Sequence, residues 1–319
     1  MWRAAVAGGF LLVVACGSPQ TVVSHAPPDL ADINPGGIPG QGMAFDFGSL
    51  WTPLVDKGAV ARVDPRTNTV AQIKNVGDPS KVSARAHVSH GTPNAVASGF
   101  GSIWAVGADQ TLSRIDPRTN KVTASTDIGV VGVAIATDET AVWIASYDDG
   151  ALVRFDPTAN RVTSTTRAAG GLIGLATGLG SVWAVNKSGH ELVRFDARSG
   201  DVVARIPAAR NPDFVAVGAG SVWVIREQPA GILRVDPVSN AVVATIDSET
   251  SWGRGVGLTF ADDSLWAGFL VRIDPASGRA IESFTGSRGD QQDSVVVGGD
   301  SAWILANGSV HRIPLSRMH

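Results

Sequence analysis

A pattern of about forty residues repeats seven times after residue 40 and limits the possible folds of this chain more than any other feature. Each unit contains an apolar run, a small residue and then a tryptophan, as in Ser221-Val222-Trp223. The seven tryptophans are Trp51, Trp104, Trp143, Trp183, Trp223, Trp266 and Trp303, spaced by 53, 39, 40, 40, 43 and 37 residues. A repeat of this length is one supersecondary unit that buries its apolar face only against its neighbours.

The second half of the unit ends in a turn motif, Arg-apolar-Asp-Pro, with Asn or Gly three residues after the proline. Five units carry the motif in full, as in Arg234-Val235-Asp236-Pro237, whereas Asp196 is followed by Ala197 and the last unit reads Arg312-Ile313-Pro314. Proline presets φ for a type I turn, and Asn or Gly accepts the left-handed position that follows. No long window has the period of a helix. Four short antiparallel strands in each such unit predict an all-β fold, a seven-bladed β-propeller with four-stranded antiparallel blades.

The ring requires a closing strand from elsewhere in the chain. The predicted blades span residues 41–75, 93–129, 131–167, 173–207, 213–247, 255–285 and 293–314, so the seventh ends before an outer strand could form. An open sheet edge would expose unpaired backbone groups. We therefore expect an N-terminal strand from residues 22–33 to complete the seventh blade. Residues 30–33 fit better than 21–24, because their distance from Trp51 is closer to that in the other units.

The N-terminal segment has the features of a secretory leader. An apolar run over residues 4–15 is too short to span a membrane and ends at Cys16, the only cysteine. Its Val-Val-Ala-Cys ending resembles a bacterial lipobox, which implies lipidation of Cys16; an ordinary cleaved signal peptide is the alternative. Both predict an extracytoplasmic protein, and the first a lipid anchor to the cell membrane. The expected domains are a lipoprotein signal peptide over 1–16, a tether with the closing strand over 17–40, and the propeller over 41–319.

Composition narrows the possible partners. The chain is 44% hydrophobic with 37 glycines, which suits many buried strands joined by tight turns. Its formal charge is −3 and it has no run of Lys or Arg, so we expect no nucleic-acid partner. We expect a monomer that contacts an envelope protein, a peptide or a small ligand.

Units such as residues 215–224, VAVGAGSVWV, resemble the extracytoplasmic seven-bladed propellers of the YVTN/YncE type and the related streptogramin (virginiamycin B) lyases. The resemblance extends over nearly all of the chain after the leader. It implies the propeller fold, but such propellers include binding scaffolds, sensors and enzymes. Two functions therefore remain open: a binding or protein-interaction module, and a carbon-oxygen lyase of the virginiamycin B type with a divergent site.

The lyase resemblance implies a glutamate three positions after the tryptophan, together with histidines and Mg²⁺. In this chain those positions hold Leu54, Gly107, Ser146, Asn186, Arg226, Phe269 and Ala306, none of which is glutamate. The carboxylates near the corresponding loops are Asp148, Asp149, Glu191 and Glu227. His87 and His90 could form half of a metal site, but a solvent-facing loop is the alternative. We expect no metal and no cofactor, and we favour the binding module over the enzyme.

The repeated residues have structural explanations. One tryptophan per blade suits packing between blades, and the repeated arginine suits bonds to carboxylates or backbone groups of the adjacent blade. Function is then expected where the blades differ, in the loops after each outer strand and between the second and third strands. The predicted ligand or partner face contains His90, Tyr147, Asp148, Asn186, His190, Arg210, Arg226, Glu227, Trp252, Arg254 and Gln291; the same loops contain Lys187, Asn211 and Asp213. Trp252, the only tryptophan after the leader that lies outside the repeats, could stack on a ligand or cover the rim of the sixth blade.

Overall fold

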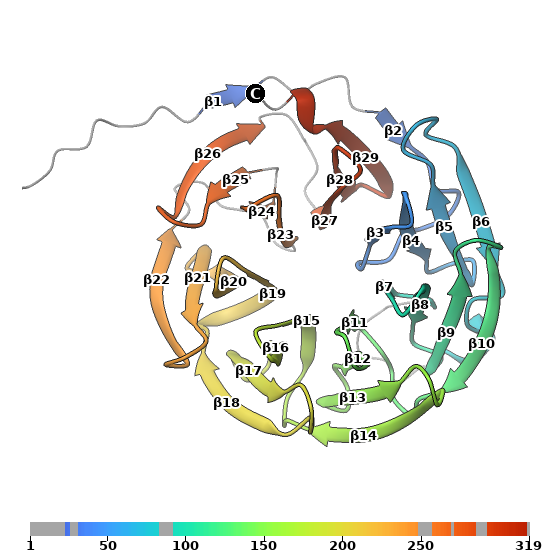
Figure 1. Cartoon of the computed structure of the whole chain (residues 1–319), viewed down its shortest axis with the longest axis horizontal. Coiled ribbons are helices and arrows are strands. Elements are labelled where there is room, and N and C mark those ends of the chain that lie inside the picture. Colours follow the sequence, from blue (N-terminus) through green and yellow to red (C-terminus); the bar gives the residue numbers. More distant parts are fainter. Residues whose placement is uncertain are drawn as a thin grey trace, which may run out of the picture.

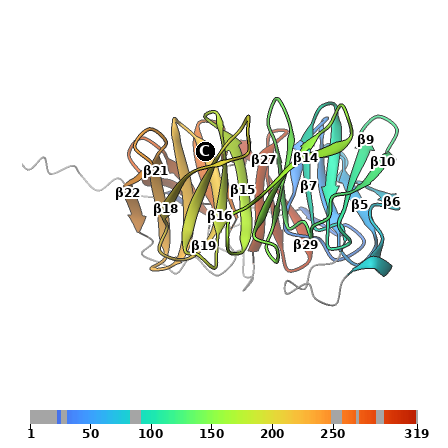
Figure 2. The ribbon, with the colours of Figure 1, turned by 90° about the horizontal axis from the view of Figure 1, so that it is seen from below.

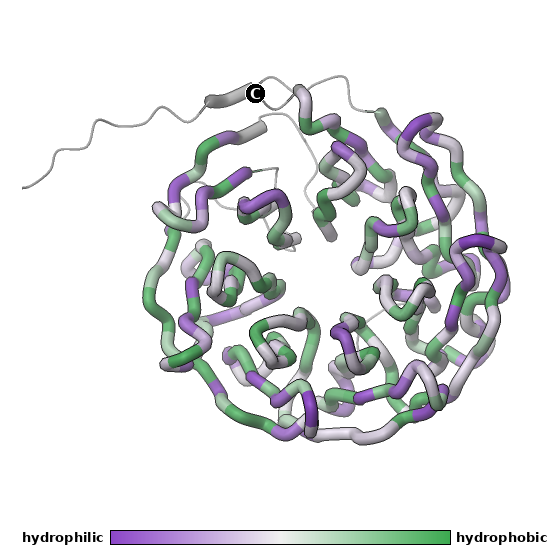
Figure 3. The backbone as a smooth tube through the Cα atoms, viewed as in Figure 1, coloured by the Kyte–Doolittle hydropathy of each residue, from purple (hydrophilic) through white to green (hydrophobic). Residues whose placement is uncertain are grey.

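Seven small sheets stand side by side in a ring around a common centre (Figure 1). The computed structural model describes residues 23–25, 31–82, 92–247, 257–268, 271–284 and 292–317. Seen from the side, the ring is a disc whose two faces are formed by the loops between strands (Figure 2). Apolar stretches run through every blade (Figure 3). The predicted seven-bladed β-propeller is therefore confirmed, and no helix in the described ranges has the length and apolarity needed to cross a bilayer.

Blades one to four each consist of four consecutive antiparallel strands. Blade one contains β3 (Ala44–Asp46), β4 (Ser49–Leu54), β5 (Ala59–Val63) and β6 (Val70–Lys74), and the short 3₁₀ helix η1 (Pro79–Lys81) follows it. Blade two contains β7 (Ala95–Gly99), β8 (Ser102–Val106), β9 (Thr111–Asp116) and β10 (Lys121–Asp127). Blade three contains β11 (Ala134–Thr137), β12 (Val142–Ser146), β13 (Ala151–Asp156) and β14 (Arg161–Arg167). Blade four contains β15 (Leu172–Gly178), β16 (Ser181–Asn186), β17 (Glu191–Asp196) and β18 (Val202–Pro207).

The remaining blades include the two N-terminal strands. Blade five contains β19 (Arg210–Gly218), β20 (Ser221–Gln228), β21 (Gly231–Asp236) and β22 (Ala241–Asp247). Blade six contains β23 (Leu258–Ala261), β24 (Ser264–Ala267), β25 (Val271–Asp274) and β26 (Arg279–Phe284), with β1 (Val23–His25) at its outer edge. Blade seven contains β27 (Gln292–Gly298), β28 (Ser301–Ala306) and β29 (Ser309–Pro314), with β2 (Ala31–Ile33) outermost; the 3₁₀ helix η2 (Leu315–Arg317) follows β29.

The ring closes as the sequence predicts. Strand β2 pairs antiparallel with β29 and places Ile33 opposite Val310. Ile33 is buried against Met43, Leu50 and Trp303, so it joins the core between blades seven and one. The closing strand thus comes from the preferred segment 30–33, of which residues 31–33 lie in the described ranges. The other candidate segment overlaps β1, which pairs in parallel with β26 and gives blade six a fifth strand.

The repeated tryptophans fill the space between blades. All seven are at most 1% exposed. Trp104 of blade two, for example, packs edge-on against Phe155 of blade three, with ring centroids 5.7 Å apart. In six blades the indole Nε1 donates to the backbone carbonyl five residues earlier; in blade three it donates to the Asp138 carboxylate. The predicted packing role is confirmed.

Each repeated arginine lies directly opposite its blade's tryptophan on the neighbouring strand, as Arg234 does opposite Trp223. The guanidinium carbon is 4.9–5.6 Å from the indole centroid in every blade, a cation–π contact that the sequence interpretation missed. In six blades Nε donates to the serine hydroxyl that begins the second strand, as from Arg194 to Ser181. Serine, tryptophan and arginine of one unit therefore form a single contact network.

Five arginines also donate to a proline carbonyl in the outer turn of the following blade, and Arg62, Arg194 and Arg312 donate to the asparagine of that turn as well. The five bonds run from Arg62 to Pro117, Arg114 to Pro157, Arg194 to Pro237, Arg234 to Pro275 and Arg312 to Pro65. These are the five prolines of the Asp-Pro motif. Arg154 precedes blade four, where Ala197 replaces proline, and Arg272 precedes blade seven, which lacks the turn. Of the two predicted acceptors, backbone groups are thus confirmed for the bonds between blades.

The Asp-Pro turns adopt the predicted geometry. Asn68, Asn120 and Asn240 have φ between 53° and 56°, the left-handed conformation that asparagine tolerates. The Asp236 carboxylate accepts a hydrogen bond from the Val238 backbone N–H, which holds the pKa of Asp236 below its usual value. Each turn is thereby fixed as a rigid acceptor for the arginine of the preceding blade.

Candidate functional site

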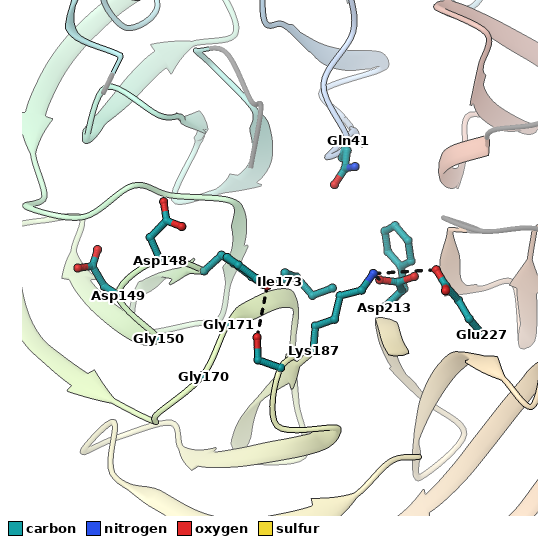
Figure 4. A pocket seen from close by; sticks show the side chains of 13 residues that line it. Gln41, Asp148, Asp149, Gly150, Gly170, Gly171, Ile173, Lys187, Asp213 and Glu227 are labelled. Carbon is teal, nitrogen blue, oxygen red and sulfur yellow. Dashed lines mark hydrogen bonds and ion pairs between the residues drawn. The ribbon is translucent and has the colours of Figure 1, made fainter. Parts of the chain in front are cut away.

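A cavity of about 710 Å³ opens on one face of the disc, over blades three, four and five (Figure 4). This face carries the loops that leave each outer strand and those that join second to third strands, where the sequence predicted the ligand site. The lining residues are Gln41, Tyr147, Asp148, Asp149, Gly150, Gly170, Gly171, Ile173, Lys187, Ser188, Asp213, Phe214 and Glu227. A second cavity of about 340 Å³ is lined mainly by inner strands and shares Gln41 and Phe214 with the first.

A charged cluster joins blades four and five at one side of this cavity, which we call the loop-face cavity. Lys187, directly after β16, extends its Nζ to 2.5 Å from Asp213 Oδ1 and 4.0 Å from Glu227 Oε1 (Figure 4). Asp213 lies on β19 and Glu227 near the end of β20. Asp213 is buried, whereas the Lys187 side chain remains 34% exposed. The ammonium therefore reaches from one blade to a carboxyl pair on the next.

The environment of Glu227 favours its protonated form. Burial raises the pKa of Glu227, and the hydrogen bond and negative charge of Asp213 raise it further. The charge of Lys187 and the hydrogen bond from Asn211 Nδ2, 3.3 Å from Glu227 Oε2, oppose this shift in part. Two carboxyl groups in contact resist being ionised together, so Glu227 keeps its proton to a higher pH than an exposed glutamate would.

The opposite side of the cavity comes from blade three. Tyr147, in the loop between β12 and β13, accepts a hydrogen bond at 3.3 Å from the Ser188 hydroxyl of blade four. Its ring lies against Gly171, where an added Cβ would be 2.1 Å from a ring carbon. Only glycine at 171 leaves the tyrosine in this place. Asp149 on the same side is held by the Ser146 hydroxyl at 3.1 Å and by Arg167 at 3.8 Å.

Three of the predicted site residues line this cavity: Tyr147, Asp148 and Glu227. Four others are placed outside its lining. His190 and Arg210 are exposed on the surface, and Arg226 pairs with Asp247 at 3.4 Å. Asn186 is fully buried, and its amide is engaged by Ala169, Gly189 and Glu191. Asn186 therefore shapes its loop.

The remaining predicted residues fall outside the described ranges. His90, Trp252, Arg254 and Gln291 are among them, as is the lipidation candidate Cys16. Their part in the ligand face stays a prediction.

Lys187 and Asp213 are the main site residues that were not selected from the sequence, although both lie in the predicted loops. Asp213 is thus a further carboxylate beside those expected near these loops, and one of the expected carboxylates, Glu191, is paired with Arg205 at 2.5 Å. The lysine and the aspartate are 26 residues apart and meet only because β16 and β19 belong to adjacent blades. When the units are aligned by their tryptophans, Lys187 and Asp213 fall at the same end of their blades. This alignment is the sequence signal that could have brought the two residues together.

The described residues do not fit the magnesium site that the lyase resemblance implies. No group of three or more His, Cys, Asp or Glu among them could hold a metal ion. At two positions equivalent to the expected glutamate, Arg226 supplies a cation and Asn186 supplies an amide already engaged by three hydrogen bonds. Neither offers the carboxylate oxygen that Mg²⁺ prefers.

Comparison with known proteins supports the fold. No protein-family model and no curated protein matches this chain in sequence. Among solved structures, one titled "Streptogramin B lyase structure" superposes with a TM-score of 0.73 over 89% of this chain and 96% of the other, at 14% sequence identity. The chain is therefore similar in fold to a streptogramin lyase propeller.

Proposed function

We propose that this chain is a binding or protein-interaction module whose ligand site is the loop-face cavity. The observation that carries the proposal is the cavity itself, with its charged cluster shared between two blades. Its volume of about 710 Å³ lies within the usual range for small-molecule sites, and it combines apolar walls with a few convergent polar groups. Blades three, four and five each contribute different residues, which a purely structural repeat does not require.

A binding function is preferred to lyase activity for a chemical reason. The similarity to a streptogramin lyase is one of fold, and propellers of one fold serve many functions. Within the described part of the chain, the residues in the lyase-equivalent positions do not supply a metal site, whereas the loop-face cavity is built from other residues.

The proposal includes an extracytoplasmic location with a lipid on Cys16, and an envelope protein, peptide or small ligand as the partner. The apolar segment that ends at the single cysteine supports the anchor. Metabolic labelling with an alkyne fatty acid in an expressing bacterium should mark the chain, and Cys16→Ser should abolish the label. Labelling that survives this substitution would contradict the anchor.

The ligand site can be tested with a pair of tryptophan substitutions. Ser188 is exposed at the cavity, so Ser188→Trp should fill it; Val238, 88% exposed in the outer turn of blade five, gives the control Val238→Trp. Small molecules and envelope peptides are screened by thermal shift against the purified chain, and hits are titrated on both variants. Binding should be lost in Ser188→Trp and kept in Val238→Trp. Hits that bind both variants equally would place the site elsewhere, and magnesium-dependent cleavage of a streptogramin B would favour the lyase.

A further inference from the structure

The charge of the loop-face cavity restricts what it can bind. Of its thirteen lining residues, Asp148, Asp149, Asp213 and Glu227 carry carboxyl groups and Lys187 carries the single ammonium. The lining side chains alone sum to −3 when Glu227 is ionised and to −2 when Glu227 holds its proton, and Arg167, outside the lining, offsets the charge of Asp149 at 3.8 Å. A concave site walled by one sign of charge concentrates ions of the opposite sign and repels those of its own.

The Lys187 ammonium shows where a cation is held in this cavity. It reaches Asp213 from the neighbouring blade at 2.5 Å and lies 4.0 Å from Glu227. The lysine side chain is one-third exposed and its four-carbon stem has rotatable bonds, which gives its ammonium a path to solvent. A ligand ammonium in the same place would meet the same two carboxyl groups.

The rest of the cavity offers apolar contacts to a ligand that carries such a charge. Ile173 and Phe214 belong to the inner strands β15 and β19, and Tyr147 presents an aromatic ring from blade three. Aromatic faces attract cations and also pack against hydrocarbon. The combination suits an amine attached to an apolar body better than a small hydrated metal ion.

We propose that the loop-face cavity binds an organic cation, a primary amine with an apolar body, whose ammonium replaces that of Lys187 at Asp213 and Glu227. This inference rests on the proposed binding function and specifies its ligand. Anions of the same size are disfavoured by repulsion from Asp213 and Glu227.

The test uses a matched set of small probes with the purified full-length chain. 2-Phenylethylamine carries the cation, 2-phenylethanol is its neutral counterpart and 3-phenylpropanoate is an anion of similar size. Each is titrated at neutral pH and low salt, with saturation-transfer NMR as the readout. The amine should bind at least about tenfold more tightly than the anion, since a charge pair or a repulsion in a half-buried site changes binding by this order.

Three variants connect the charge preference to this cluster. Lys187→Met removes the competing ammonium and should strengthen binding of the amine by about three- to tenfold, whereas Glu227→Gln removes a carboxylate and should weaken it by about threefold. Asp262→Asn removes an exposed carboxylate in the turn between β23 and β24, on the other face of the disc, and should change nothing.

The results separate this inference from the proposed function. Preference for the amine, together with a gain in Lys187→Met, supports the inference. Equal binding of all three probes, preference for the anion, or no binding of the amine overturns it. In each of these cases the proposed function is still judged by whether screened ligands lose binding in Ser188→Trp.

Discussion

At the residue scale, the repeated motif is explained by one side chain that makes three kinds of contact. The arginine of each unit stacks on the indole of its own blade and, in most blades, bonds to the serine before that tryptophan and to a proline carbonyl in the next blade. The sequence predicted a bond between blades because arginine and the Asp-Pro turn recur together. It did not reveal the stacking, which depends on the register of two strands.

Replacing Arg194, which makes all of these contacts, should destabilise the ring more than replacing Arg154, which does not bond to the next blade. Arg194 contacts Trp183, Ser181, Pro237 and Asn240, whereas the Arg154 Nε is buried without a partner. We expect Arg194→Met to lower the free energy of unfolding by about 2 kcal/mol and Arg154→Met by about 1 kcal/mol or less. Urea unfolding followed by tryptophan fluorescence measures both. Equal losses would show that the bridge to the next blade adds nothing.

A substitution can restore the hydrogen bond to arginine that blade three lacks. Ala141 occupies the position at which the other six blades have serine, and it is fully buried. Ala141→Ser should give the Arg154 Nε its missing acceptor and raise the free energy of unfolding by about 0.5–1 kcal/mol. Ala145→Ser adds the same hydroxyl at an equally buried position four residues later, on β12, and should destabilise the chain. A loss of stability in both variants would contradict the view that the serine of each unit is the acceptor for arginine Nε.

The Glu227 carboxyl group should make stability depend on pH in one direction. Because its folded-state pKa is raised above the ordinary 4.5, the stability that its proton contributes is complete below that value and is lost as pH rises through the folded-state pKa. Glu227→Gln stays neutral and avoids this loss. The variant should therefore gain stability relative to the parent chain as pH rises from about 4.5 towards neutrality.

Urea unfolding of both chains at a series of pH values measures this difference. The lowered pKa values of the turn aspartates, such as Asp64 and Asp236, are common to both chains and cancel. Glu139→Gln, at an exposed position, serves as the control. A difference that does not change with pH would show that Asp213 and burial leave Glu227 unperturbed.

At the scale of elements, the strands and the closing strand of the ring could be predicted from the sequence, because turn residues and the forty-residue repeat are local signals. The Asp-Pro and Gly-rich turns mark both ends of each hairpin, and the short seventh unit demanded a strand from the N-terminus. Residues 21–24 were a candidate for the closing strand, but the parallel pairing of β1 with the outer edge of blade six could not be predicted, because three residues at a sheet edge carry no sequence pattern. The contact between Lys187 and Asp213 was also beyond the sequence, because it depends on how two blades sit side by side.

The closing strand should be held mainly by one side chain. Ile33 is 5% exposed and packs in the core between blades seven and one, whereas Asp32 on the same strand is exposed. We expect Ile33→Ala to lower the free energy of unfolding by about 3 kcal/mol, as for other buried aliphatic residues. Asp32→Ala should change it by less than about 0.5 kcal/mol. Similar small effects of both substitutions would show that β2 does not secure the ring.

At the scale of the whole molecule, the blade junctions differ in strength. The junction between blades three and four lacks the arginine bond and contains a cavity of about 660 Å³ on the face opposite the loop-face cavity. That cavity is lined by the turns at 137–140 and 178–181, together with Ala197 and Arg198. The inner strands remain joined by a hydrogen bond from the Thr177 hydroxyl to the Thr137 carbonyl, so the weakness is confined to the outer turns.

Hydrogen exchange should reveal this difference between two equivalent turn amides. Asn120 N–H bonds to Asp116 in a turn that receives Arg62, and Gly200 N–H bonds to Asp196 in the turn that receives no arginine. Local opening should cost less where a bridge is missing, so we expect the protection factor of Gly200 to be about fivefold lower than that of Asn120. Arg62→Met should lower the protection of Asn120 to the level of Gly200 and leave Gly200 unchanged. Equal protection in the parent chain would mean that the outer turns open together with the whole ring, and that its seven junctions act as one cooperative unit despite their different bonds.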